Sequence, residues 1–139
     1  ETLDGARRIA VRSLQKLPET PVGAAGYNVR YRVDSLPSET LSLLKPLLDK
    51  SLSDAGYVIG GKALRREVKF GDGTLNLSIT TPTEGPAEIE FNFHRTSLKT
   101  DELQHWLSVP LDEIRQVVTT LSSNVLGLVL GSGEVEDGI

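Results

Sequence analysis

The chain has 139 residues, of which 38% are hydrophobic, so it holds a single domain of ordinary size. Its 15 lysines and arginines against 19 aspartates and glutamates give a net charge of −4, which disfavours a broad nucleic-acid-binding surface. The absence of cysteine excludes disulfides, thiol catalysis and cysteine-ligated metals, and it fits a cytoplasmic protein. No apolar run approaches the length of a transmembrane helix, so we expect no membrane partner.

The N-terminal part of the chain predicts two helices around one strand. Residues 5–17 carry apolar side chains at three- and four-residue spacing, which is typical of a helix. Residues 22–34 alternate between apolar and polar side chains and predict a half-buried strand. Residues 38–55 predict a second helix, and Pro46 inside it predicts either a kink or a division into two short helices. The expected buried stripe of this second helix consists of Leu41, Leu44, Leu48 and Leu52.

Three further strands follow in quick succession, separated by turns rich in glycine, proline and aspartate. Their expected ranges are 57–70, 74–81 and 87–95. The last of them alternates most clearly and should be buried on one side. Its expected inward side chains are Ala87, Ile89, Phe91 and Phe93.

The C-terminal part of the chain predicts helices and a tail. A short helix is expected over 101–107, with Trp106 packed into the core. A longer helix is expected from Pro110, because proline is favoured in the first turn. Residues 125–130 fit either an extension of this helix or a last short strand, and residues 131–139 predict a flexible acidic tail.

These elements predict an α+β fold in the order α-β-α-β-β-β-α-α. Strands joined by short turns form an antiparallel meander, and the first strand adds to one edge because a helix separates it from the others. The expected architecture is therefore a four-stranded, mostly antiparallel sheet with helices packed on one face, built by residues 1–130 as a single domain. The other face is either solvated or covered by a partner.

The polar side of the predicted sheet is the candidate ligand or partner surface. If the first and last strands are neighbours, the arginines of one pair with the glutamates of the other. The residues then form either an exposed salt-bridge ladder, which contributes little stability, or a binding surface. The candidates are Asn28, Arg30, Arg32, Asn76, Glu88, Glu90, Asn92 and His94.

Motifs for metal or cofactor chemistry are weak. His94, Asp101 and His105 are the one group that suggests a metal, but the spacing of 11 between the histidines matches no common ligand pattern. The segment 60–62, Gly-Gly-Lys, lacks the glycine spacing and the following serine or threonine of a phosphate-binding loop. We therefore expect no bound metal and no cofactor.

Three short segments carry a resemblance to known proteins. They are Leu17-Pro18-Glu19-Thr20-Pro21-Val22, Gly26-Tyr27-Asn28 and Phe91-Asn92-Phe93-His94. Together they resemble a loosely defined group of uncharacterised bacterial proteins. The resemblance implies a bacterial, cytoplasmic protein and transfers no functional residue. In that group the matching region follows an N-terminal stretch that this chain lacks, which implies a fragment of a longer protein.

Two hypotheses about function follow from these patterns. The first is a non-enzymatic interaction or assembly module that binds a second copy of itself or another protein. In a homodimer the polar faces could meet about a two-fold axis, and such an interface would weaken with salt. The alternative is a small-molecule-binding domain or an unusual hydrolase that uses His94 with Asn92 and Arg95. A deep pocket beside His94 favours the alternative, whereas a flat face favours the module.

Overall fold

The computed structural model describes residues 2–16 and 22–129, and it has the α+β fold that the sequence predicts. The acidic tail expected at residues 131–139 lies outside the described residues. The strands are β1 (Ala24–Val33), β2 (Lys62–Phe70), β3 (Gly73–Thr81) and β4 (Ala87–Thr96). The helices are α1 (Leu3–Lys16), α2 (Ser38–Leu43), α3 (Leu47–Asp54), α4 (Thr100–Leu107) and α5 (Leu111–Thr120), and α5 continues into the π-helical turn η1 (Leu121–Val125).

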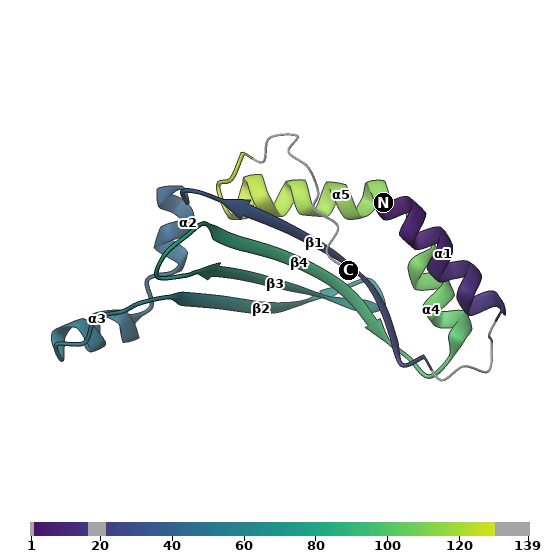
Figure 1. The fold of residues 1–139 in the computed structure, drawn as a ribbon, viewed down its shortest axis with the longest axis horizontal. Helices are drawn as coiled ribbons and strands as arrows, with labels where there is room; N and C mark the ends of the chain where they lie inside the picture. The colour runs from purple at the N-terminus through teal and green to yellow at the C-terminus, as the bar shows by residue number, and fades with distance from the viewer. Residues whose placement is uncertain (1, 17–21, 130–139) are drawn as a thin grey trace.

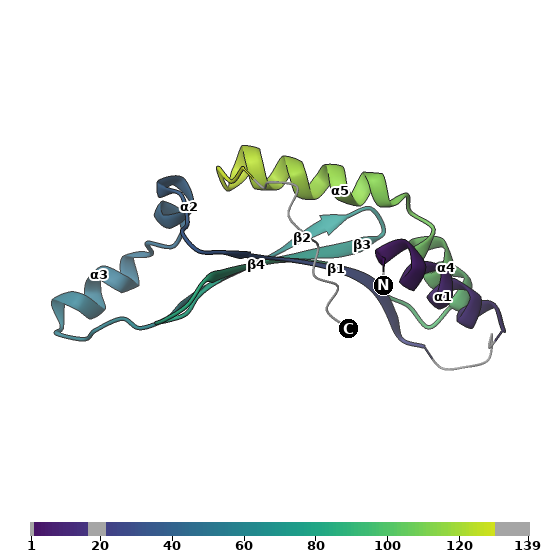
Figure 2. The same cartoon turned by 45° about the horizontal axis from the view of Figure 1, so that its top comes forward.

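The sheet is antiparallel throughout, with the strand order β1-β4-β3-β2. The first strand therefore lies at one edge, as expected, and its neighbour in the sheet is the last strand. Helix α5 crosses one face of the sheet, and α1 and α4 lie together at one end (Figures 1 and 2). Helices α2 and α3 lie at the opposite end, where α3 projects beyond the strands (Figure 1).

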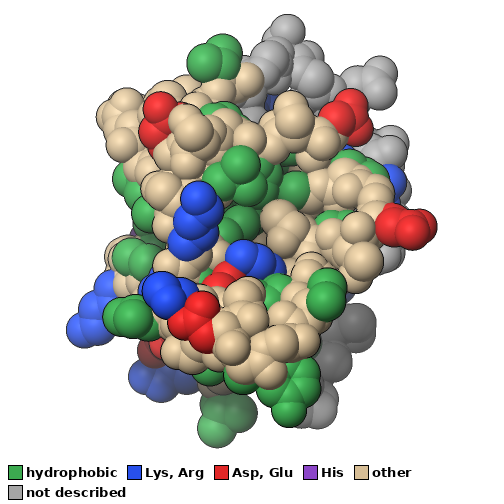
Figure 3. Space-filling view, turned by 90° about the vertical axis from the view of Figure 1, so that its left-hand side faces the viewer, with side chains coloured by type: hydrophobic (Ala, Val, Ile, Leu, Met, Phe, Trp, Pro, Cys, Tyr) green, Lys and Arg blue, Asp and Glu red, His purple; other side chains and the backbone are tan. Residues whose placement is uncertain are grey.

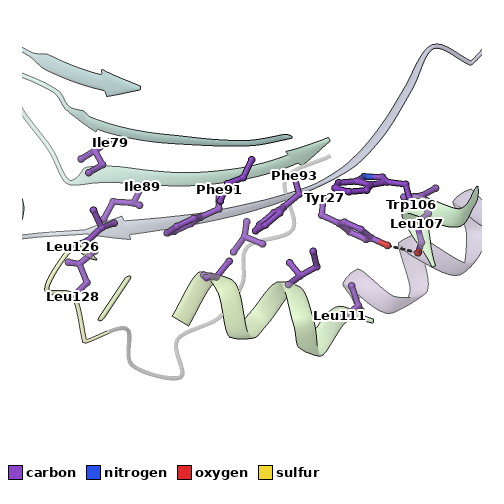
Figure 4. Packing of buried hydrophobic residues seen from close by; sticks show 14 of the residues in the cluster. Tyr27, Ile79, Ile89, Phe91, Phe93, Trp106, Leu107, Leu111, Leu126 and Leu128 are labelled. Atoms are coloured by element: carbon purple, nitrogen blue, oxygen red, sulfur yellow. Dashed lines mark hydrogen bonds between the residues drawn. The ribbon is translucent and has the colours of Figure 1, made fainter. Parts of the chain in front are cut away.

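The core lies between the sheet and α5. Strand β4 alternates as predicted, because Ala87, Ile89, Phe91 and Phe93 are buried and the residues between them are partly exposed. Buried side chains of α5 and of the segment after it pack against these buried side chains of the sheet (Figure 4). The hydroxyl of Tyr27 donates a hydrogen bond to the carbonyl oxygen of Leu107, which joins β1 to α4.

Trp106 closes the end of the core that lies beneath α4. It is buried, as predicted, and its ring meets the ring of Phe70 edge-on, with 5.7 Å between centroids. Gly73 makes this packing possible, since a Cβ at that position would lie 2.6 Å from the tryptophan ring. The two-residue turn between β2 and β3 includes Gly71, whose φ of 51° is readily adopted by glycine.

The buried stripe predicted for the second helix is wrong. Pro46 divides the segment into α2 and α3, which is one of the two outcomes expected of it. Leu44 is buried, but Leu41 and Leu48 are exposed, and α3 buries none of its residues. The division redirects the chain, so α3 no longer continues the face that α2 presents to the core.

The boundaries of two other predicted elements also change. Residues 57–61 do not belong to the strand predicted over 57–70, because β2 begins at Lys62. At the other end of the chain, residues 126–129 are neither helix nor strand. This segment is nevertheless anchored, since the hydroxyl of Thr40 donates to the carbonyl oxygen of Leu126 and the side chain of Leu126 is buried.

A cluster of polar groups links the end of β4 to α4. The carboxylate of Glu102 accepts hydrogen bonds from Ser97 (3.0 Å) and Arg95 (2.6 Å), and it lies 3.1 Å from Nζ of Lys99. Lys99, Ser97 and Arg95 lower the pKa of Glu102 from its ordinary 4.5 to about 2. A carboxyl group with a depressed pKa in the folded state stabilises the fold above about pH 4.5, and this stabilisation is lost as the pH falls towards 2.

We therefore expect Glu102→Gln to flatten the acid side of the stability profile. Between about pH 6 and about pH 3 the wild type should lose more unfolding free energy than the variant, because glutamine cannot titrate. Urea denaturation at both pH values measures the difference. Glu113→Gln, an exposed position on α5, is the matched control and should follow the wild type. An equal loss in Glu102→Gln and the wild type would contradict the assignment.

Candidate functional site

The eight candidate residues lie together on the face of the sheet opposite α5, and we call this surface the polar face. The strand registers bring them together, because Asn92 lies opposite both Asn28 and Asn76, and His94 follows on the same side of β4. The same register places the two arginines of β1 opposite the two glutamates of β4. These pairs are Arg30 with Glu90 and Arg32 with Glu88.

The charges of the polar face pair within the chain. Nη2 of Arg30 lies 3.0 Å from a carboxylate oxygen of Glu90, and Nε of Arg30 lies 3.3 Å from one of Glu88. The prediction that opposite charges pair across these strands is therefore confirmed. Partly exposed pairs of this kind contribute about 0–1 kcal/mol each, so their main effect is to neutralise this part of the surface.

A row of amides crosses three strands beside the ion pairs. Asn76 is only 8% exposed, although it lies on the polar side, and its Nδ2 lies 3.1 Å from Nδ1 of His94. Among the described residues, Oδ1 of Asn76 and Oδ1 of Asn28 are buried without a hydrogen-bond partner. These oxygens are acceptors that a water molecule or a polar group of a ligand could satisfy.

The residues of the alternative hypothesis do not converge. Asn92 and His94 share the polar face, but Arg95 points to the other side of β4, where it binds Asp72 and Glu102. His105 lies on α4. Within residues 2–16 and 22–129, no three histidine, aspartate or glutamate side chains are grouped so that they could hold a metal ion.

Two cavities lie beside α1. One, of about 370 Å³, is apolar and lies between α1, the start of β1 and Leu107. The other, of about 360 Å³, is lined by the basic side of α1 together with Leu107 and Ser108. Neither of these cavities is lined by a residue of the polar face.

A second candidate surface lies at the far end of the molecule, and the pattern of the sequence did not indicate it. We call residues 47–61, which comprise α3 and the segment that leads into β2, the arm. Leu47 and Leu48 on α3 are 85% and 64% exposed, and Tyr57 and Val58 after it are 67% and 97% exposed. Figure 3 views this end of the molecule and shows hydrophobic side chains at the surface among charged ones.

An ion pair joins the arm to the sheet, and the lysine of this pair also binds the backbone that precedes the arm. Asp49 of α3 forms an ion pair with Lys62, the first residue of β2, and Nζ of Lys62 also donates to the carbonyl oxygen of Leu44 at 3.4 Å. Gly56 follows α3 with a φ of 87° and reverses the chain towards β2. The signal that could have warned of the arm was Pro46, because a proline between Leu44 and Leu48 interrupts the helix that would have placed these leucines on one face.

Strand β2, into which the arm leads, is an open edge. Among the described strands it pairs only with β3. Its residues 65–69 are all exposed, and they include Val68, which lies on the helix side of the sheet. An edge strand presents unpaired backbone groups that another strand can bind.

No family model, curated protein or solved structure matches this chain. Among the described residues, no helix combines the length and the apolar character that crossing a bilayer requires.

Proposed function

We propose that the protein is a non-enzymatic assembly module that associates with a second copy of itself. The observation that carries this proposal is the arm, because α3 buries none of its residues and exposes Leu47 and Leu48, and the segment after it exposes Tyr57 and Val58. An isolated helix of this length is marginal in water, so packing against another surface would stabilise it. Apolar side chains gathered on a surface are typical of an interaction site.

A second copy is the partner to which the proposal commits. Two-fold homodimers are the commonest soluble oligomers, and a two-fold axis brings both arms into the same interface. The polar face is less suited to this role, because Glu88 and Glu90 already bind Arg30 of their own chain. We therefore place the association at the arm and not at the polar face.

The test replaces an exposed leucine of the arm. Leu47→Glu should weaken self-association at least about tenfold. Burying one leucine side chain contributes about 1.5–3 kcal/mol, and each dimer loses two buried leucine side chains, one from each protomer. Leu98→Glu is the matched control, since Leu98 is 96% exposed but lies between β4 and α4. Sedimentation equilibrium over a range of concentrations measures the dissociation constant of each protein.

We expect the wild type and Leu98→Glu to form dimers. Leu47→Glu should dissociate into monomers at concentrations at which the wild type is still dimeric. Circular dichroism of Leu47→Glu should match the wild type, because the side chain is exposed in the single chain. A wild-type protein that remains monomeric at several hundred micromolar would overturn the proposal. Equal weakening by both variants would show that the arm has no special part in association.

A further inference from the structure

We infer that two copies join edge to edge through β2 and form one continuous antiparallel sheet. This inference rests on the proposed self-association and names the strand that carries it. The edge of β2 is open in the described residues, and five consecutive side chains along it, residues 65–69, are exposed. What distinguishes β2 from an ordinary edge is the order of its charges.

The charges of β2 are complementary to those of a second β2 in the register that pairs the whole strand, Lys62–Phe70. A two-fold axis perpendicular to the sheet at Arg66 places Arg65 opposite Glu67 of the partner subunit, and Glu67 opposite Arg65 of the partner subunit. Opposed residues of antiparallel strands lie on the same face, so both pairs are in reach across the new strand boundary. On the other face, the same register places Leu64 opposite Val68 of the partner subunit. A two-fold axis at Val68 would also place Glu67 opposite Lys69 of the partner subunit, but it aligns only residues 66–70.

Neighbouring registers lack this complementarity. With the axis at residue 65, Arg65 meets Arg65 of the partner subunit. With the axis at residue 67, Glu67 meets Glu67 of the partner subunit, and Arg65 meets Lys69 of the partner subunit. Like charges directly opposite each other destabilise a strand pair. In the favoured register the one like-charge contact is Arg66 with its own copy, on the axis.

The opposite edge of the sheet does not offer the same fit. The charged residues of β1 are Arg30 and Arg32, which have the same sign. Arg30 is also held by Glu88 and Glu90 of its own chain. A second β1 would therefore bring basic side chains together without an acidic partner, whereas β2 carries both signs.

The arm adds to the same interface. It leads directly into Lys62, so pairing along β2 carries each arm past the end of the β2 strand of the partner subunit. A stable interface usually buries about 1,200–2,000 Å² in total, which is more than one pair of strands supplies. The exposed leucines of the arm provide further apolar surface at both ends of the joined strands.

Charge reversal tests the register. Arg65→Glu and Glu67→Arg should each weaken the homodimer about tenfold, because two attractive pairs become repulsive in each case. An equimolar mixture of the two variants should recover wild-type affinity, since every Glu–Glu or Arg–Arg contact becomes Glu–Arg in the heterodimer. Glu113→Arg, at an exposed position on α5, changes the charge as Glu67→Arg does; it is the control and should dimerise as the wild type does. Sedimentation velocity of the single variants and of the mixture gives the readout.

Amide hydrogen exchange supplies a second readout that does not depend on the variants. The amides of β2 should exchange more slowly as the wild-type concentration rises, whereas those of β1 should not change. If the wild type dimerises but neither the charge reversals nor the exchange of β2 responds, the β2 interface is wrong and the self-association stands. If the wild type does not dimerise, both proposals are overturned.

Discussion

Replacement of Phe91 by alanine is expected to lower the free energy of unfolding by about 3–5 kcal/mol, which threatens the stability of a domain of this size. Phe91 is 0% exposed and lies at the centre of the sheet, opposite Val29 of β1 and Leu77 of β3. Its ring meets the ring of Tyr31 edge-on, with 6.3 Å between centroids. Alanine would leave a cavity between β4 and the helix layer. Strand β4 can move little to fill this cavity, because it is paired with β1 on one side and with β3 on the other.

Urea denaturation of Phe91→Ala measures this loss. Asn92→Ala is the control, because Asn92 is the next residue of the same strand but lies on the polar face and is only partly buried. It should cost about 1 kcal/mol or less. A loss under about 1 kcal/mol for Phe91→Ala, or equal losses for the two variants, would show that the inward and outward sides of β4 are assigned incorrectly.

Gly26→Ala is expected to destabilise the protein by about 3 kcal/mol, at the upper end of the usual range for overpacking. A Cβ on residue 26 would lie 2.1 Å from the carbonyl oxygen of Phe93 and 2.9 Å from Cα of His94. Both contacts are with backbone atoms of β4, so no side chain can rotate away. The strand pair β1–β4 must separate locally, and this displaces the buried Tyr27 and Phe93 beside it.

Gly23→Ala is the matched control for Gly26→Ala. It lies three residues earlier in the same segment, and a Cβ there would meet no atom within 4 Å. Its unfolding free energy should therefore stay within about 0.5 kcal/mol of the wild type. Thermal and urea denaturation of both variants measure the change in unfolding free energy. A Gly26→Ala variant as stable as Gly23→Ala would mean that β1 and β4 are not so closely apposed at this point.

The strands and their faces followed from local pattern. Alternation in β4 is a property of consecutive residues, because successive side chains of any strand point to opposite faces. Short turns between the last three strands leave only an antiparallel meander. The fold class and the inward aromatic rings could therefore be derived from the sequence, whereas the pairing of Arg30 with Glu90 required β1 to lie beside β4, which the sequence left open.

The tertiary structure decided where helices and polar side chains lie relative to distant segments. The pattern of Leu41, Leu44, Leu48 and Leu52 is periodic whether or not a core is within reach, so it could not reveal that α3 projects beyond the sheet. The burial of Asn76 depends on the side chains of neighbouring strands, including His94, which is 18 residues away in the sequence. The requirement for glycine at position 26 likewise arises from the backbone of β4. The sequence by itself determined which side of each strand is apolar, because that is local, whereas exposure and close contact depend on which distant residues fold against it.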